Sequence, residues 1–279
     1  VFWRGKAKWD PLVFGGYQEQ KLRAGTEGVH QVVGLGAATG LARRRREGAF
    51  ARMTELRDWF VGELRKLVPD IVVNEAPVGK QLPGTLNLTF PGKEGIRLLA
   101  GLDCYGVSVS IGSACTADSI EPSHVLLGMG LGKEAALSSI RMSIGVTTSR
   151  RDLAYALKVL KIVLKGDPAG LAYLDPQHLT EERIRSPKTF LVDLRFPYER
   201  MMSPTIPGAR EWSHIYFERF IPRVPRDKEV ILVCGTGVFS LSAGYRLANS
   251  GHPNVRVVYG GYAAWKGLYP NLVGKLRQE

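Results

Sequence analysis

The sequence has little cysteine: Cys104, Cys115 and Cys234 are the three among 279 residues. An odd and sparse set argues against a disulfide framework and favours reduced thiols, so we expect a cytoplasmic protein. No two cysteines or histidines have the close spacing of a metal-binding loop, so we expect no metal site. At least one thiol is therefore free for chemistry.

Long apolar runs are also absent. No run reaches the length of a membrane-spanning helix. The opening VFWRGKAKWD mixes aromatic and charged residues, whereas a signal peptide has an apolar core. We therefore expect no membrane partner. The first residue is Val1 rather than Met, so we expect the chain to be part of a longer protein.

Acidic residues are outnumbered, since 38 Lys and Arg against 26 Asp and Glu give a net charge of +12. The densest basic cluster lies in ARRRREGAFARMTELRDWF, residues 42–60, where arginines and apolar residues share a helical pattern. One interpretation is the solvated face of a long helix, and the other is a docking surface for an acidic partner or for RNA. Because no aromatic residues alternate with the basic ones, we do not expect a nucleic-acid partner.

Residues 1–165 combine helical and strand-like patterns. A short aromatic strand and a turn at Asp10-Pro11 precede a long helical stretch, with Thr26 as its N-cap and a break or bend near the arginines. Strands are predicted over 70–76, 84–90, 105–112 and 137–145, and helices over 93–105, 122–130 and 149–166. This order predicts a small α+β layered domain.

The pattern changes after residue 165. Residues 166–178 are interrupted by glycine and proline and are predicted to be a linker. Beyond them, buried strands are predicted over 189–195, 229–235 and 255–261, with a helix over 240–251. This run predicts a second domain, residues 179–279, with a parallel sheet and right-handed crossovers.

Cys234 ends a buried strand in EVILVCGTGVFS, and a glycine-rich loop follows it before a helix that we expect to begin near Ser240. Ligands bind at the carboxyl ends of parallel strands. Loop N–H groups and a helix N-terminus there would favour a sulfur anion. We therefore expect Cys234 to be a nucleophile or a persulfide carrier.

Residues 179–279 resemble a rhodanese domain. The resemblance rests on FLVDLR with Asp193 and Arg195, on Glu199, on IPGA over 206–209 and on VRVVYGGYAAW, which ends at Trp265. The family's loop reads Cys-Arg-x-Gly-x-Arg-Ser/Thr, whereas this loop reads CGTGVFS and lacks both arginines. Because arginine binds an oxyanion with paired N–H donors, we expect thiosulfate to bind poorly and a protein persulfide still to react. The alternative is a domain that keeps the fold without activity.

Cys115 lies in SVSIGSACTADSIEPSHVL among small residues that cannot bury it well. Four motifs in order resemble the C-terminal part of cysteine desulfurases of the iron–sulfur-cluster type, which are pyridoxal-phosphate enzymes of aminotransferase class V. They are GGYQEQKLRAGTEGV (15–29), LPGTLNLTFPG (82–92), VSIGSACTADSIEPSHVLLGMGL (109–131) and SIRMSIGVTTSRRDL (139–153). The fold class that follows is α/β: the small α+β domain of a fold-type-I pyridoxal-phosphate enzyme, then a rhodanese-like parallel α/β domain.

This resemblance implies roles for particular residues. Cys115 would take sulfur from L-cysteine and become a persulfide, on a loop whose small residues let it swing toward an acceptor. Arg141 would bind the substrate carboxylate as a fork. Thr26 would reach the cofactor phosphate of a neighbouring subunit, which implies a homodimer. The alternatives are an inert Cys115 and an ordinary strand role for Arg141. His124 either caps a helix or moves protons, and Cys104 belongs in a helix core.

The family's Schiff-base lysine, which lies in a His-Lys motif, has no counterpart in this chain, and residues 1–30 would be a remnant of the larger cofactor-binding domain. We therefore expect pyridoxal phosphate in the full-length parent and no desulfuration by this chain alone. The leading hypothesis is a sulfur relay from Cys115 to Cys234 and on to a protein acceptor or iron–sulfur scaffold. The alternatives are a rhodanese-type sulfurtransferase whose first half serves dimerisation or docking, and a non-catalytic basic binding module.

Overall fold

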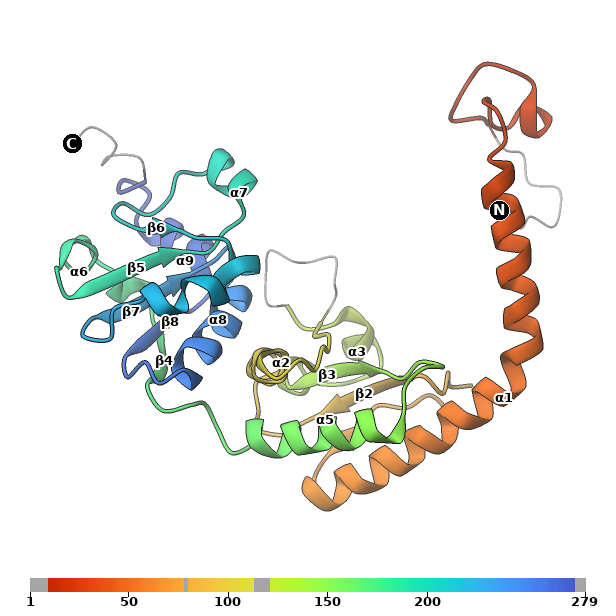
Figure 1. Ribbon diagram of the computed structural model, residues 1–279, viewed down its shortest axis with the longest axis horizontal. Coiled ribbons are helices and arrows are strands. Elements are labelled where there is room, and N and C mark those ends of the chain that lie inside the picture. The colour runs from red at the N-terminus through yellow and green to blue at the C-terminus, as the bar shows by residue number, and fades with distance from the viewer. Residues whose placement is uncertain (1–9, 78–79, 113–120, 274–279) are drawn as a thin grey trace. The chain divides into compact units, whose positions relative to one another are not determined.

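The computed structural model describes residues 10–77, 80–112 and 121–273 (Figure 1). The chain forms two compact units, residues 1–51 and 52–279. The first unit contains the short helix η1 (Gln18–Lys21) and the first part of α1 (Val29–Leu67). None of the described helices is long and apolar enough to cross a membrane.

The start of α1 corrects one expectation. Helix α1 begins three residues after Thr26, so Thr26 is not its N-cap residue. Gly25, with φ of 103°, and Gly28 flank Thr26 and Glu27, and glycine disfavours a helical backbone. The long helical stretch is one continuous helix. The predicted aromatic strand falls mostly on residues 1–9, which lie outside the described residues.

A small antiparallel sheet follows α1. Strands β1 (Val72–Val73), β2 (Thr85–Thr89) and β3 (Ser139–Ser143) pair in the order β1-β2-β3. The predicted strand over 105–112 is wrong: apart from one isolated bridge between Ser110 and Arg141, the segment does not pair as a strand, because only Ser110 comes into register with β3.

Side chains alternate across this sheet because strand residues point to opposite faces in turn. Leu86, Leu88, Ile140 and Met142 are buried in the first hydrophobic cluster. Against them pack the C-terminal part of α1, α2 (Gly95–Cys104) and α5 (Arg150–Val163). Two short helices, α3 (His124–Gly128) and α4 (Lys133–Leu137), precede β3, and α4 was not predicted. The helices that share this cluster cover one face of the sheet, and a cleft lies on the opposite, polar face.

The second sheet is parallel throughout and has the order β4-β8-β7-β5-β6. The bounds are β4 (Leu171–Leu174), β5 (Thr189–Asp193), β6 (Arg210–Glu211), β7 (Glu229–Val233) and β8 (Val255–Val258). Strand β4 lies inside the stretch 166–178 assigned to a linker, and it pairs with β8 at one edge of the sheet. The interdomain stretch therefore also supplies an edge strand.

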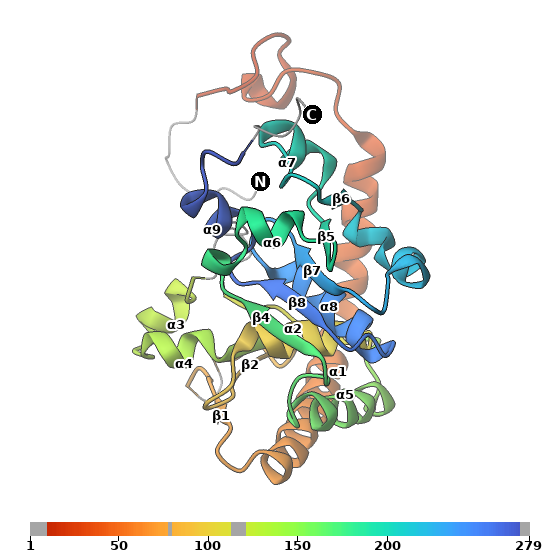
Figure 2. The ribbon, with the colours of Figure 1, turned by 90° about the vertical axis from the view of Figure 1, so that its left-hand side faces the viewer.

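Each face of the parallel sheet carries its own hydrophobic cluster. Helices α8 (Val238–Asn249) and η3 (His214–Arg223) contribute to the cluster on the face of Val192 and Leu232. Helix α9 (Gly261–Leu268), with η2 (Pro176–His178) and α6 (Glu181–Arg185) nearby, belongs to the cluster on the face of Leu191 and Val233 (Figure 2). The short α7 (Pro197–Met202) follows β5. The sheet is thus covered on both sides, as parallel sheets require.

Helix α2 joins the two domains within the unit 52–279. Leu98 and Leu102 belong to the first cluster, whereas Ile96 and Ala100 belong to the cluster that contains α8. Gly101 lets the helices approach, because a Cβ there would lie 2.7 Å from Val163 Cγ1 and 3.3 Å from the Tyr245 ring. The two domains therefore share a packed junction.

Substitution of Gly101 tests this junction. We expect Gly101→Ala to destabilise the protein by about 1–3 kcal/mol, because the added methyl group meets Val163 in a well-packed interior. Gly62→Ala is the matched control: Gly62 is an exposed helical glycine with nothing near its would-be Cβ, and the change should stabilise by roughly 0.5–1 kcal/mol. Urea unfolding of both variants measures the difference, and equal stabilisation of both would contradict the packed junction.

Candidate functional site

Cys234 directly follows β7, and two backbone N–H groups donate hydrogen bonds to its sulfur atom. The backbone N–H groups of Gly237 and Ser240 donate to Sγ at 3.2 Å and 3.3 Å, and the Ser240 hydroxyl oxygen lies 3.4 Å from Sγ. The Cys234 side chain is fully buried. Backbone donors aimed at one point in a buried site stabilise negative charge that develops there. This loop can therefore support chemistry at sulfur.

The loop is held by the first turn of α9. Tyr262 N donates to the Cys234 carbonyl at 2.8 Å, and Ala263 N donates to the Gly235 carbonyl at 3.1 Å. Gly261 makes this approach possible, since its φ is 64° and a Cβ would meet the Cys234 carbonyl oxygen and lie 2.6 Å from Gly237 N. Because α9 takes up these loop carbonyls, the loop N–H groups that donate to sulfur are left pointing at it.

An aromatic rim adjoins the loop. Phe239, the residue before Ser240, stacks on the His214 ring with centroids 4.2 Å apart, and Phe196 meets His214 edge-on at 4.3 Å. Nδ1 of His214 is buried and has no hydrogen-bond partner among the described residues. Burial lowers the pKa of His214 below its usual value of 6.5, opposed in part by the Leu194 backbone and the Glu199 charge. His214 received no role from the sequence, because η3 brings it to the loop from a distant position.

Glu199 places a carboxylate beside the same loop. One oxygen, Oε2, accepts a hydrogen bond from Phe196 N at 2.7 Å, which fixes the side chain. The other, Oε1, lies 2.7 Å from the position that a Cβ on Gly235 would occupy. Gly235 stands where the rhodanese motif carries its first arginine. The loop therefore has a nearby negative charge where that motif has a positive one.

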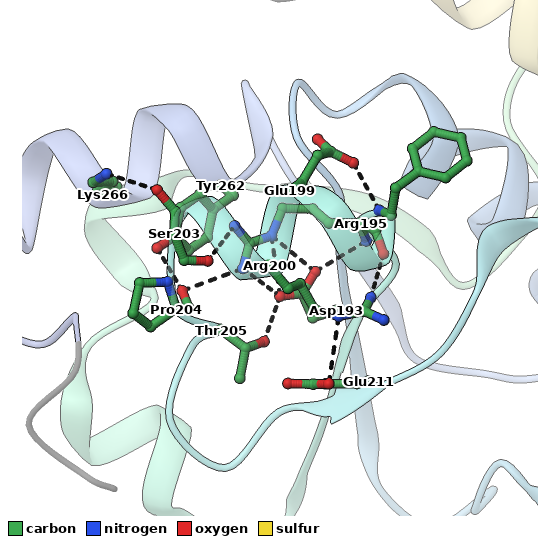
Figure 3. Close-up of polar contacts among 11 residues, drawn as sticks. Asp193, Arg195, Glu199, Arg200, Ser203, Pro204, Thr205, Glu211, Tyr262 and Lys266 are labelled. Carbon is green, nitrogen blue, oxygen red and sulfur yellow. Dashed lines mark hydrogen bonds and ion pairs between the residues drawn. The ribbon is translucent and has the colours of Figure 1, made fainter.

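Asp193 and Arg195 form a buried ion pair at the end of β5 (Figure 3), with Arg195 Nη2 and Asp193 Oδ2 2.7 Å apart. The Arg195 guanidinium also donates to the carbonyl oxygens of Ser203 and Pro204 at 3.2 Å, and it lies 3.5 Å from the centroid of the Tyr262 ring. Removing one partner of such a pair leaves an uncompensated buried charge. The pair thus ties the loop after α7 to α9, the helix that holds the Cys234 loop.

The second candidate site is a cleft of about 360 Å³ on the polar face of the small sheet. Arg141 from β3 lines it together with Ser123 and His124 at the start of α3 and Asn87 from β2. Arg141 is exposed, and no carboxylate of the described residues pairs with it. A guanidinium on an open cleft is suited to a substrate carboxylate.

Cys115 lies outside the described residues, but the residues on either side of its segment are placed. Gly112 lines the Arg141 cleft, and a Cβ on Gly112 would lie 2.9 Å from the Glu121 carbonyl oxygen. The two ends of the segment that carries Cys115 therefore meet at this cleft.

The remaining predicted residues lie apart from these sites. Thr26 is exposed and belongs to the unit 1–51. Cys104 is half-buried at the end of α2, where Asn249 Nδ2 donates to its sulfur at 3.4 Å and burial raises its pKa. Ser123 precedes α3 without a side-chain capping bond. Within the described part of the chain, no cluster of three or more His, Cys, Asp or Glu could hold a metal ion.

Both parts of the chain match known protein families. Residues 13–155 match the aminotransferase class-V family. The chain belongs to this family. Residues 177–268 match the rhodanese-like domain, so this class-V chain carries a rhodanese-like domain at its C-terminal side. Both resemblances seen in the sequence are confirmed, as is the mixed α/β fold class.

Relatives of the class-V part are cysteine desulfurases. The chain is 41% identical over 165 residues to the cysteine desulfurase IscS of Dictyoglomus turgidum, a match that covers 59% of this chain and 42% of that protein. It is 41% identical over 150 residues to an IscS-like cysteine desulfurase of Mycobacterium tuberculosis, covering 54% and 38%. A NifS-like protein from Rickettsia africae is similar at 30% identity with a TM-score of 0.49, covering 56% and 40%. The chain thus spans about two fifths of the length of these relatives.

The class-V family and its desulfurase members imply dependence on pyridoxal phosphate. The described residues that line the Arg141 cleft include no lysine to bond the cofactor aldehyde and no Phe, Tyr or Trp to stack on its ring. This lining does not fit the cofactor itself. The lining does fit the carboxylate of a substrate, which these residues can bind without a cofactor.

The lowered pKa of His214 has a consequence for stability. At pH values between the lowered pKa of folded His214 and the usual pKa of 6.5, the unfolded chain binds more protons than the folded chain. The free energy of unfolding is therefore highest above pH 6.5 and decreases as the pH falls through this range. His214→Phe keeps an aromatic ring on Phe239 and should flatten this dependence. Unfolding midpoints measured from pH 7.5 down to pH 5 compare the two proteins, and equal slopes would contradict the assignment.

Proposed function

We propose that this protein carries sulfur from L-cysteine on Cys115, passes it to Cys234 and delivers it to a protein acceptor. The observation that carries the proposal is the convergence of the backbone N–H groups of Gly237 and Ser240 on the buried sulfur of Cys234. The desulfurase relatives and the rhodanese-like domain both support sulfur transfer as the chemistry.

The transfer between the two cysteines balances without an added oxidant or reductant. The Cys234 sulfur, as thiolate, attacks the terminal sulfur of a persulfide on Cys115. One S–S bond forms, the S–S bond to Cys115 breaks, and Cys115 leaves as a thiolate. The loop N–H groups would then stabilise negative charge on the Cys234 side of the exchange.

The junction between the domains supports transfer within one chain. Ile111 packs against both the small-domain cluster and the cluster that contains α8. Cys115 follows Ile111 by four residues, which an extended chain covers in about 14 Å. The two domains are also joined by an ion pair between Arg246 Nη2 and Asp103 Oδ2 at 3.2 Å. Such tethering raises the local concentration of the acceptor for the donor.

The charge around the Cys234 loop supports a persulfide donor over thiosulfate. Gly235 and Phe239 supply no cation at the two positions where the rhodanese motif has arginine. Glu199 Oε1 adds a negative charge close to Gly235. A dianion such as thiosulfate would be repelled there, whereas a persulfide presented by a protein carries its sulfur without a sulfonate group.

The other components follow from the same proposal. We place L-cysteine as the sulfur donor, pyridoxal phosphate as the cofactor of the full-length protein with Thr26 near its phosphate, and a protein acceptor such as an iron–sulfur scaffold downstream. We propose that the full-length protein works as a homodimer in the cytoplasm.

Persulfide trapping tests the order of transfer. The full-length protein is supplied with L-cysteine, its persulfides are alkylated, and the modified peptides are identified by mass spectrometry. We expect added sulfur on both Cys115 and Cys234. Cys115→Ser should empty both positions because it removes the donor, and Cys234→Ser should leave Cys115 loaded.

Cys104→Ser is the matched control and should leave both positions loaded, because Cys104 is placed in the packing of α2 rather than in either site. Thiosulfate offered in place of L-cysteine should load Cys234 at least tenfold more slowly than the relay does. Loading of Cys234 from L-cysteine in Cys115→Ser would contradict the relay.

A further inference from the structure

A chain of hydrogen bonds crosses the polar face of the small sheet. The Ser139 hydroxyl donates to the Ala135 carbonyl at 2.7 Å, and Ser139 Oγ lies 2.7 Å from Thr89 Oγ. Asn74 Nδ2 contacts Thr89 Oγ at 2.8 Å and Asn87 Oδ1 at 2.7 Å. Thr89 and Ser139 are buried, so their hydroxyl groups depend on these partners.

The carbonyl at one end sets the direction of every bond in this chain. A carbonyl oxygen only accepts, so the Ser139 proton is used on Ala135 and the Thr89 hydroxyl must donate to Ser139. Thr89 Oγ can then only accept from Asn74, which must present its NH₂ group. The same NH₂ group faces Asn87, so Asn87 presents its oxygen to Asn74 and turns its own NH₂ group away.

The Asn87 NH₂ group is left beside Arg141. Residues 87 and 141 lie directly opposite each other on β2 and β3. Arg141 uses both of its backbone groups on Ser110, at 2.7 Å and 3.0 Å. The 87–141 pair is therefore a non-hydrogen-bonded pair, in which Cα atoms are about 4.5 Å apart and side chains are closest. Both side chains line the cleft, and Asn87 Nδ2 has no partner among the described residues.

We propose that Asn87 is a second carboxylate-binding residue of this cleft, donating an N–H to the substrate carboxylate that Arg141 pairs with, and that Ser139 is a positioning residue that sets its orientation. The inference rests on the proposed function, in which the cleft binds the carboxylate of L-cysteine. An amide N–H next to a guanidinium adds a further donor to the two that the guanidinium presents to the oxygens of a carboxylate.

Solution NMR of the chain tests the assignment without measuring catalysis. L-cysteine and cysteamine share a thiol and an amine, and only L-cysteine has the carboxylate. We expect L-cysteine to shift the Asn87 side-chain amide signals and cysteamine to leave them unchanged. Asn87→Asp replaces the donor with an acceptor of the same shape, and it should weaken L-cysteine binding at least tenfold.

A pair of serine variants separates positioning from simple destabilisation. Ser139→Ala removes the hydroxyl that sets the direction of these hydrogen bonds. The side-chain amides of Asn74 and Asn87 can then rotate by about 180°, and L-cysteine should no longer shift the Asn87 amide signals. Ser143→Ala is the matched control: Ser143 lies on the same face of the same strand and is not part of the chain of bonds. It should bind L-cysteine as the unsubstituted chain does.

The outcomes distinguish this inference from the proposed function. If Arg141→Gln abolishes the preference for L-cysteine over cysteamine while Asn87→Asp retains full binding, the carboxylate site stands and the role of Asn87 is wrong. If the unsubstituted chain binds both compounds equally, the substrate site of the proposed function is itself wrong, and the inference is overturned with it.

Discussion

Where buried polar groups of this protein form a hydrogen-bonded series, the group that can only accept or only donate determines how the others point. The Ala135 carbonyl sets the direction of the bonds through Ser139 and Thr89 to Asn87. The first N–H groups of α9 do the same for the Cys234 loop, because they take up its carbonyl oxygens. In both candidate sites, the polar groups are therefore oriented by backbone groups that can only accept or only donate a hydrogen bond.

The two sites also share a mechanical support. Helix α2 contributes to the cores of both domains, and Gly101 brings it close enough to α5 and α8 for this to happen. The residue before Gly112, Ile111, packs on both cores at the beginning of the segment that carries Cys115. The segment that carries the proposed sulfur donor therefore begins next to the packing that joins the two domains.

Much of the fold follows from local patterns. The strands at 84–90, 189–195 and 229–235 and the helix at 149–166 were predictable because alternation, apolar runs and helical spacing are strong there. Strand β4 was not, because four residues between glycine and proline form an edge strand only when β8 is present to pair with them. The reverse error at 105–112 has the same origin: an alternating pattern becomes a strand only where a neighbour comes into register.

The sequence by itself determined the residues on which the proposed chemistry depends: Cys234 before a glycine-rich loop, Cys115 among small residues, Arg141 on a strand, and the motifs that carry both family resemblances. These are local, because a residue type and its neighbours along the chain define them. Only the tertiary structure decided that Glu199 and His214 lie beside the Cys234 loop and that Asn87 lies directly opposite Arg141 in the small sheet. Those relations depend on pairing between strands and on packing of distant helices, and spacing along a chain does not encode distance in space.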